Sequence, residues 1–191
     1  MKKRNPFLLL GFWMVLLSLA LLLGSGLLNR FHQKQTAEII RQIESLLPQA
    51  GTGSPHDYSS AELPVLQLEG QEFSGLIRIP SFGVTLPMGS SWDSGDISRY
   101  PCRFWGSMYD GSLVIGGKDQ PGQLDFFPRL DPGEKIIVTD MTGIQFHYTV
   151  SRIDRSKHAD AENLITDDWD LTLFVRDSTS LDYILVRCSY S

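Results

Sequence analysis

The chain has 191 residues, 42% of them hydrophobic, and its 17 Lys and Arg against 22 Asp and Glu give a net charge of −5. This length fits one ordinary domain with accessory segments and excludes a large multidomain enzyme. The acidic balance argues against a nucleic-acid partner, and two cysteines are too few for a disulfide scaffold or a four-cysteine zinc site. No zinc-type spacing or phosphate-binding loop occurs, so we expect neither a metal nor a cofactor.

The first apolar segment runs from Phe7 to Leu28, inside a stretch from Asn5 to Asn29 that has no charged residue. As a helix it would reach about 33 Å, enough to cross a hydrocarbon core of about 30 Å. Basic residues at positions 2–4 precede it, so the positive-inside rule predicts residues 1–6 in the cytoplasm and the rest outside the plasma membrane. The alternative is a cleaved signal peptide, although the apolar run is longer than an ordinary signal core. We therefore expect a single-pass anchor.

Residues 29–60 are predicted to connect this anchor to the folded domain. Apolar residues of the Ile39–Leu47 face recur on one side of a helix, which predicts a short stalk helix over Phe31–Leu47. That face would lie on the membrane or pair with another copy in an oligomer; the alternative is a simple spacer. Gly, Ser and Pro are frequent at positions 51–60, which predicts a flexible linker.

The domain expected over residues 61–191 holds 11 Lys and Arg against 19 Asp and Glu, so it carries the negative charge of the chain. Its apolar runs are short and separated by turn signals, a pattern typical of strands in a closed or sandwiched β architecture. One helical turn is expected within Ala159–Trp169. The aromatic-rich stretch Arg99–Tyr109 is interpreted as a lid or pocket wall, or as a loop pinned by its own aromatic contacts. The predicted strands are Gly75–Ile79, Val84–Met88, Leu113–Ile115, Lys135–Thr139, Gln145–Ile153, Leu171–Val175 and Tyr183–Cys188.

Several stretches of this domain resemble, in the right order, segments of the sortase domain. Gly75–Pro87 (GLIRIPSFGVTLP) is similar to the opening signature I-x-I-P-x-x-G-V-x-L-P, and Asp110–Gly117 (DGSLVIGG) resembles the strand that leads to the catalytic histidine. Asp125–Thr139 resembles the segment that follows, and Trp169–Phe174 with Val186–Cys188 resembles the last two strands. The resemblance implies a mainly β, closed barrel of seven or eight strands with short helices, carried on an N-terminal membrane anchor.

Sortases are cysteine transpeptidases of Gram-positive cell surfaces that attack the Thr–Gly bond of a Leu-Pro-x-Thr-Gly-like sorting signal. The family uses a Cys thiolate as nucleophile, a His for proton transfer and an Arg to stabilise charge. At the matching positions this sequence has Arg176 for the Cys, Lys118 for the His and Tyr183 for the Arg. Arg176 stays protonated and only donates hydrogen bonds, so it cannot attack a carbonyl carbon. The resemblance therefore implies an inactive homologue.

Two cations, Lys118 and Arg176, would then face each other across the groove of the family. They would repel unless Asp119, Asp177 or Asp182 compensates their charge, or unless an anion or a peptide binds between them. The alternative is that they are ordinary solvated residues in a groove without a ligand. The candidate groove residues are Lys118, Asp119, Arg176, Asp177 and Tyr183.

The two cysteines offer a further alternative. Cys102 and Cys188 are either thiols or partners in a disulfide, which an extracellular location would permit. As thiols they could support relocated catalysis with His147 or His158 as the base, although a cysteine in a strand is more often a small buried hydrophobic residue.

Three functional hypotheses follow from these observations. The first is an inactive sortase homologue that binds a sorting-signal peptide, a pilin or an active sortase. The second is an active transpeptidase or hydrolase with relocated catalytic residues. The third is a purely structural ectodomain.

Overall fold

The structure is a computed structural model that describes residues 6–48, 51–53, 58, 62–92, 96–166 and 168–191. Within the first helix it describes side chains only for residues 11–19 and from residue 35 onward. Contacts divide the chain into two compact units, Met1–Gln35 and Thr36–Ser191. All the β-structure belongs to the second unit.

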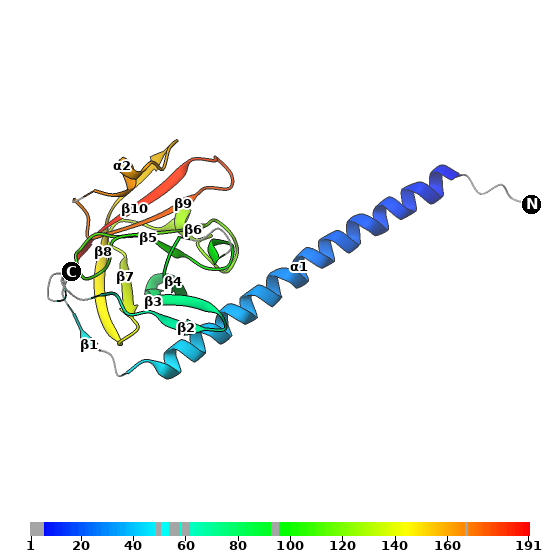
Figure 1. The fold of residues 1–191 in the computed structure, drawn as a ribbon. Coiled ribbons are helices and arrows are strands. Elements are labelled where there is room, and N and C mark those ends of the chain that lie inside the picture. Colours follow the sequence, from blue (N-terminus) through cyan, green and yellow to red (C-terminus); the bar gives the residue numbers. More distant parts are fainter. Residues whose placement is uncertain (1–5, 49–50, 54–57, 59–61, 93–95, 167) are drawn as a thin grey trace, which may run out of the picture. The chain divides into compact units, whose positions relative to one another are not determined.

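The N-terminal helix α1 runs from Pro6 to Leu46 and covers both the predicted anchor and most of the predicted stalk as one helix (Figure 1). Its apolar side chains between Phe12 and Leu19 are 41% to 67% exposed. Over the residues that can be described, no helix has an apolar stretch long enough to cross a membrane. The side chains at positions 7–10 and 20–28 of the predicted span lie outside the described residues. The membrane anchor therefore stays a prediction.

Eight strands close into a barrel, as the resemblance implies. They follow one another around the barrel in the order β8, β10, β9, β6, β5, β4, β3 and β7, and β7 pairs with β8 to complete the ring (Figure 1). All seven predicted strands are confirmed, several with longer bounds. The barrel strands are β3 (Gln71–Ile79), β4 (Val84–Gly89), β5 (Cys102–Trp105), β6 (Leu113–Lys118), β7 (Lys135–Asp140), β8 (Ile144–Ser156), β9 (Leu171–Arg176) and β10 (Tyr183–Tyr190).

Short elements complete the second unit. Strand β1 (Gly51–Thr52) adds to β8, and β2 (Leu66–Leu68) adds to β3. The predicted helical turn is α2 (Ala161–Leu164), and three-residue 3₁₀ turns occur at η1 (Pro80–Phe82), η2 (Asp96–Ser98) and η3 (Phe127–Arg129).

Side chains alternate between the inside and the outside of the barrel, as the two-residue period of a strand requires. On β9, Leu171, Leu173 and Val175 belong to the interior cluster, whereas Phe174 belongs to a separate cluster on the outer face. The alternation explains why these strands could be predicted from short apolar runs.

Of the two interpretations of Arg99–Tyr109, the pocket wall is confirmed, because residues 103–106 line a cavity. The loop is corrected, because part of the stretch forms strand β5. Arg103 pairs with Ile115 and Trp105 with Val114, so Phe104 is an extra residue in a β-bulge. A bulge interrupts the regular alternation of a strand. The strand is also only four residues long. Because it is short and contains a bulge, it could not be predicted from the sequence.

The predicted flexible linker contains ordered residues. Gly51 and Thr52 pair with β8 as β1. The ring of Tyr58 lies 5.4 Å from that of Tyr109 and 6.3 Å from that of Phe146, centroid to centroid. The remaining linker positions 54–57 and 59–60 lie outside the described residues.

The predicted apolar face of the stalk packs on the barrel of the same chain. Ile43 is fully buried, and Ile39, Ile40 and Leu47 pack in the same cluster. Oligomerisation through this face stays a prediction, and it would compete with this contact. The barrel side of the cluster is formed by Phe73, Leu76, Tyr100 and Cys102.

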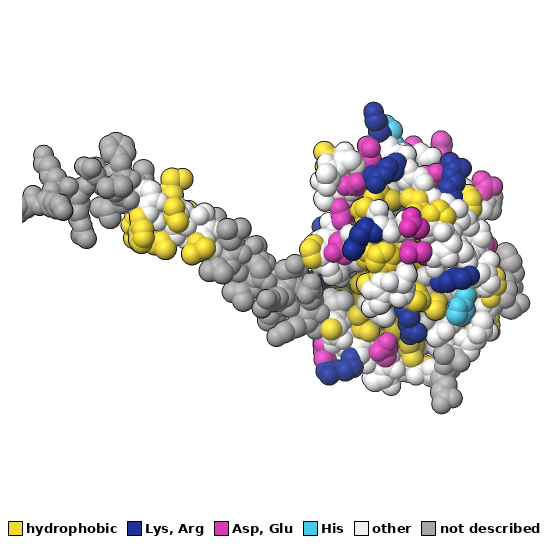
Figure 2. Space-filling model, turned by 180° about the vertical axis from the view of Figure 1, so that it is seen from behind, with side chains coloured by type: hydrophobic (Ala, Val, Ile, Leu, Met, Phe, Trp, Pro, Cys, Tyr) yellow, Lys and Arg dark blue, Asp and Glu magenta, His cyan; other side chains and the backbone are white. Residues whose placement is uncertain are grey.

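Charge is spread rather than gathered on the face of the barrel shown in Figure 2. Basic and acidic side chains alternate there with hydrophobic ones. Some carboxylates are used within the fold: Asp140 accepts a hydrogen bond from the Tyr109 hydroxyl at 2.6 Å and another from the backbone N–H of Ile144 at 2.9 Å.

Replacing Ile43 with Ala should lower the free energy of unfolding of the full-length protein by about 2–5 kcal/mol, because a cavity would remain in a closed cluster. Chemical denaturation in a non-ionic detergent measures this change. Leu46 lies in the same helix and is 59% exposed, so Leu46→Ala should shift the free energy by no more than about 0.5 kcal/mol. Equal losses in the two variants would contradict the docking of α1.

Candidate functional site

Three positions identified by the resemblance lie in one row across neighbouring strands. Lys118, at the end of β6, is paired with Arg176 at the end of β9. Arg176 is paired in turn with Tyr183 at the start of β10. Because adjacent strands lie about 4.8 Å apart, the tertiary structure places these three residues side by side.

The row lies on the outer face of the barrel. The residues that precede its two cations face inward: Val175 belongs to the interior cluster, and a Cβ added to Gly117 would meet Leu124 inside the barrel. Alternation therefore directs Lys118 and Arg176 outward. Both side chains are exposed, and Tyr183 is half-buried.

A cavity of about 350 Å³ adjoins this row, with Arg176 and Tyr183 in its wall. Its other walls are mostly apolar and come from five parts of the chain. They are the β4–β5 connection (Trp92, Ile97), β5 (Phe104), β6 (Gly117), β9 (Phe174) and the β8–β9 connection (Ala159, Leu164).

Three aromatic rings in this wall pack against one another. Trp92 stacks on Phe174 with centroids 5.4 Å apart, and Phe104 meets both rings edge to face at 5.3 and 5.6 Å. Gly116 makes room for them, because a Cβ at this position would overlap the rings of Trp92 and Phe174. Phe104 lies in the stretch Arg99–Tyr109 that was interpreted as a pocket wall, and this interpretation is confirmed for it. Nothing in the sequence indicated that Trp92 and Phe174 join it.

Gln123 connects the row to the wall. Its side-chain oxygen accepts a hydrogen bond from the backbone N–H of Lys118, and its side-chain nitrogen donates to the Ile97 carbonyl at 3.1 Å. Gln123 is only 1% exposed. A buried amide with both ends bonded fixes the neighbouring backbone, so it holds Lys118 and Ile97 in place.

Arg187 holds the opposite wall. This buried residue of β10 donates to the Thr172 hydroxyl at 2.9 Å and to the Asn163 carbonyl at the end of α2. Burial lowers the pKa of Arg187 from its ordinary value. A cation suits the carbonyl end of a helix. Arg187 thereby fixes the segment whose Leu164 lines the cavity.

The guanidinium of Arg176 is oriented by local contacts. Its Nε donates to the Leu181 carbonyl at 3.2 Å, and its Cζ lies 6.0 Å from the centre of the Tyr183 ring. Among the described residues, neither Arg176 nor the Lys118 ammonium forms an ion pair. The row therefore presents two uncompensated cations beside an apolar cavity.

The nearby carboxylates are committed to the β9–β10 loop instead. Asp119 accepts hydrogen bonds from the Ser178 N–H at 2.8 Å and the Ser178 hydroxyl at 2.6 Å. Asp177 accepts from the backbone N–H groups of residues 179 and 180, and it pairs with Arg155 at 3.0 Å. The predicted compensation of Lys118 and Arg176 by Asp119 or Asp177 is thus not what these contacts provide. Among the described residues, Asp182 forms no ion pair with either cation.

The same contacts make the loop sensitive to acid. Hydrogen bonds from the Thr179 N–H, from Arg155 and from Ser180 lower the pKa of Asp177 from its ordinary value of 3.8 to about 2. A carboxyl with a depressed pKa in the folded state stabilises the fold above its unfolded pKa. That contribution disappears as the pH falls through the folded value.

Asp177→Asn should therefore make the protein less stable at neutral pH, and the difference from wild type should shrink between about pH 4 and about pH 2. Denaturation midpoints of the full-length protein across this range measure the effect. Asp125→Asn changes an exposed carboxyl outside this loop, and it should leave the profile unchanged. A constant difference at all pH values for Asp177→Asn would contradict the assignment.

The cysteines lie apart from the row. Cys188 is fully buried in the interior cluster. Cys102 is fully buried in the cluster that contains Ile43 of α1. No disulfide joins them, so of the two alternatives the structure contains thiols. Burial raises the pKa of the Cys188 thiol, which is the opposite of what activates a cysteine nucleophile.

Comparisons with known proteins agree with this architecture. No protein-family model and no curated protein sequence matches the chain. A lid mutant of sortase A from Corynebacterium diphtheriae superposes with a TM-score of 0.57 at 20% identity, over 83% of this chain and 93% of that chain. A lid mutant of sortase C1 from Streptococcus agalactiae gives 0.56 at 17% identity over 66% and 71%.

Sortase A from Listeria monocytogenes gives a TM-score of 0.53 at 15% identity, over 62% of this chain and 87% of that chain. Likeness at such low identity establishes architecture rather than chemistry. The closed eight-stranded ring and these superpositions together show that the chain has the sortase fold.

Proposed function

We propose that this protein is a membrane-anchored, sortase-like binding protein that holds a peptide segment without cleaving it. The observation that carries this proposal is the row of Lys118, Arg176 and Tyr183 beside an apolar cavity. A sortase-like scaffold is thereby combined with a row that has no cysteine nucleophile.

The lack of a cysteine in the row supports the binding role over catalysis. Arg176 presents only donors, and Lys118 has no neighbouring thiol in the row to activate. Relocated catalysis would need an accessible thiolate. Both Cys102 and Cys188 are fully buried, so we favour the inactive homologue over a rearranged enzyme.

The chemistry of the groove favours a sorting-signal type of ligand. An apolar wall containing Phe104, Phe174 and Leu164 suits the Leu and Pro side chains of a Leu-Pro-x-Thr-Gly segment. The cations Lys118 and Arg176 are suited to hydrogen-bond its carbonyl oxygens or a carboxylate. Such a segment would reach the groove as part of a surface protein or pilin, or alongside an active sortase.

The exposed apolar side chains of α1 support attachment to a membrane. Seven large hydrophobic side chains between Phe12 and Leu19 are exposed, and contiguous exposed apolar surface in a soluble protein is uncommon. A lipid bilayer would cover them. This arrangement would place the barrel on the extracellular side, with residues 1–6 in the cytoplasm.

The test uses the full-length protein in lipid nanodiscs and a fluorescein-labelled Leu-Pro-Ala-Thr-Gly peptide. Fluorescence anisotropy should detect binding, and Arg176→Glu should weaken it by about tenfold or more, because a charge-assisted hydrogen bond is replaced by repulsion. Lys135→Glu makes the same change of charge on β7, which lies opposite β6 in the ring. It should leave the affinity unchanged.

Mass spectrometry of the same mixtures distinguishes the alternatives. The wild-type protein should form neither a thioester nor a cleaved peptide. Cleavage by the wild type would overturn the inactive assignment and support the rearranged enzyme. Absence of peptide binding would support the purely structural ectodomain.

A further inference from the structure

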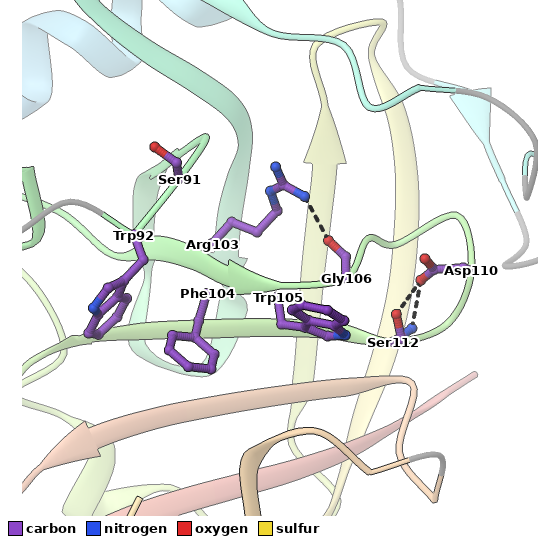
Figure 3. Close-up of a pocket in the computed structure, with 8 residues that line it drawn as sticks. All are labelled: Ser91, Trp92, Arg103, Phe104, Trp105, Gly106, Asp110 and Ser112. Carbon is purple, nitrogen blue, oxygen red and sulfur yellow. Dashed lines mark hydrogen bonds between the residues drawn. The ribbon is translucent and has the colours of Figure 1, made fainter. Parts of the chain in front are cut away.

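A second cavity, of about 440 Å³, adjoins the Trp92–Phe104 pair, and its lining residues are drawn in Figure 3. It shares only these two rings with the first cavity. Its volume is within the range of small-molecule sites, roughly 300–1,000 Å³. The proposed peptide groove makes no use of its remaining residues.

The β-bulge in β5 builds the aromatic side of this cavity. In a regular strand the consecutive residues Phe104 and Trp105 would point to opposite faces. The extra residue in the bulge removes that alternation. Figure 3 shows the rings of Trp92, Phe104 and Trp105 on the same side of β5. Trp92 is 42% exposed and Trp105 is 53% exposed, so two indole rings are available to a ligand.

Polar residues form the rest of the lining of this cavity. Asp110 accepts hydrogen bonds from the Ser112 N–H at 3.0 Å and the Ser107 N–H at 3.2 Å, which closes the loop that follows β5. Arg103 donates to the Gly106 carbonyl at 3.0 Å (Figure 3). Gly106 has a φ of 60°, and a Cβ there would overlap Ser112. The loop is therefore preorganised before any ligand binds.

The charge of the wall selects the kind of ligand. The lining contains one cation, Arg103, and one anion, Asp110, together with the hydroxyls of Ser91 and Ser112. Such a wall has no net charge, and it offers both donors and acceptors. Both charged groups already form hydrogen bonds within the protein, so neither requires a ligand of opposite charge. A neutral ligand with several hydroxyls can use their remaining donor and acceptor positions.

We infer that this cavity is a saccharide-binding site for neutral pyranose sugars. The flat C–H face of a sugar ring packs on an indole, and its hydroxyls donate to Asp110 and accept from donors at the rim. This inference is independent of the proposed peptide binding, because Trp105, Asp110 and Ser112 do not line the first cavity.

The experiment uses the full-length protein in nanodiscs, which avoids detergents with sugar headgroups. The probes are chitotriose and cellotriose, and binding is measured by saturation-transfer NMR and isothermal titration. Wild type should bind at least one probe, and Trp105→Ala should weaken binding by about tenfold, the effect expected for loss of one aromatic contact. Trp13→Ala removes an indole that lines neither cavity and should change nothing.

Two further measurements separate this site from the peptide groove. Arg176→Glu should leave saccharide affinity unchanged, and Trp105→Ala should leave binding of the Leu-Pro-Ala-Thr-Gly peptide unchanged. The inference is overturned if wild type binds neither saccharide, or if Trp105→Ala retains full affinity. It is also overturned if Trp105→Ala weakens peptide binding, because the cavity would then be an extension of the peptide groove.

Discussion

The parallel pairing of β6 with β9 is the interaction on which the candidate site depends. Six consecutive residue pairs, from Leu113↔Leu171 to Lys118↔Arg176, hold the two strands in register. A slip of one residue would turn every side chain of one strand to the other face. Parallel strands need a long connection, and here β7 and β8 lie within it and complete the barrel. The pairing of β6 with β9 is therefore part of the closed barrel and also sets the position of the site.

Two backbone features, Gly116 and the bulge in β5, determine how the aromatic rings are arranged on the outer face of the barrel. Gly116 admits the ring of Trp92 close to the sheet, and the bulge at Phe104 turns a second indole to the same side. Trp92 and Phe104 then separate two cavities of different chemistry. One cavity borders on cations, and the other contains one charge of each sign. A single aromatic wall therefore borders two cavities.

The substitutions in the row change its chemistry at little cost to the fold. Lys118 and Arg176 remain exposed to solvent, where water screens the repulsion between two cations. The loop beside them is stabilised separately by Asp119 and Asp177. Most of the cavity wall comes from Leu164, Phe174 and their neighbours, whereas Arg176 and Tyr183 are the members of the row that line it.

The sequence by itself determined the seven predicted strands, the residues at the three row positions and the acidic character of the domain. These are local properties, because a strand is recognised by its two-residue period and a motif is recognised by the spacing of its residues. Only the tertiary structure revealed β5, the cavities and the packing of Ile43 on the barrel of its own chain. It also decided that Asp119 and Asp177 bind the loop rather than the cations. A sequence pattern shows that a face is apolar or that a carboxylate is near in the chain. Which partner meets it depends on long-range pairing, which no local pattern encodes.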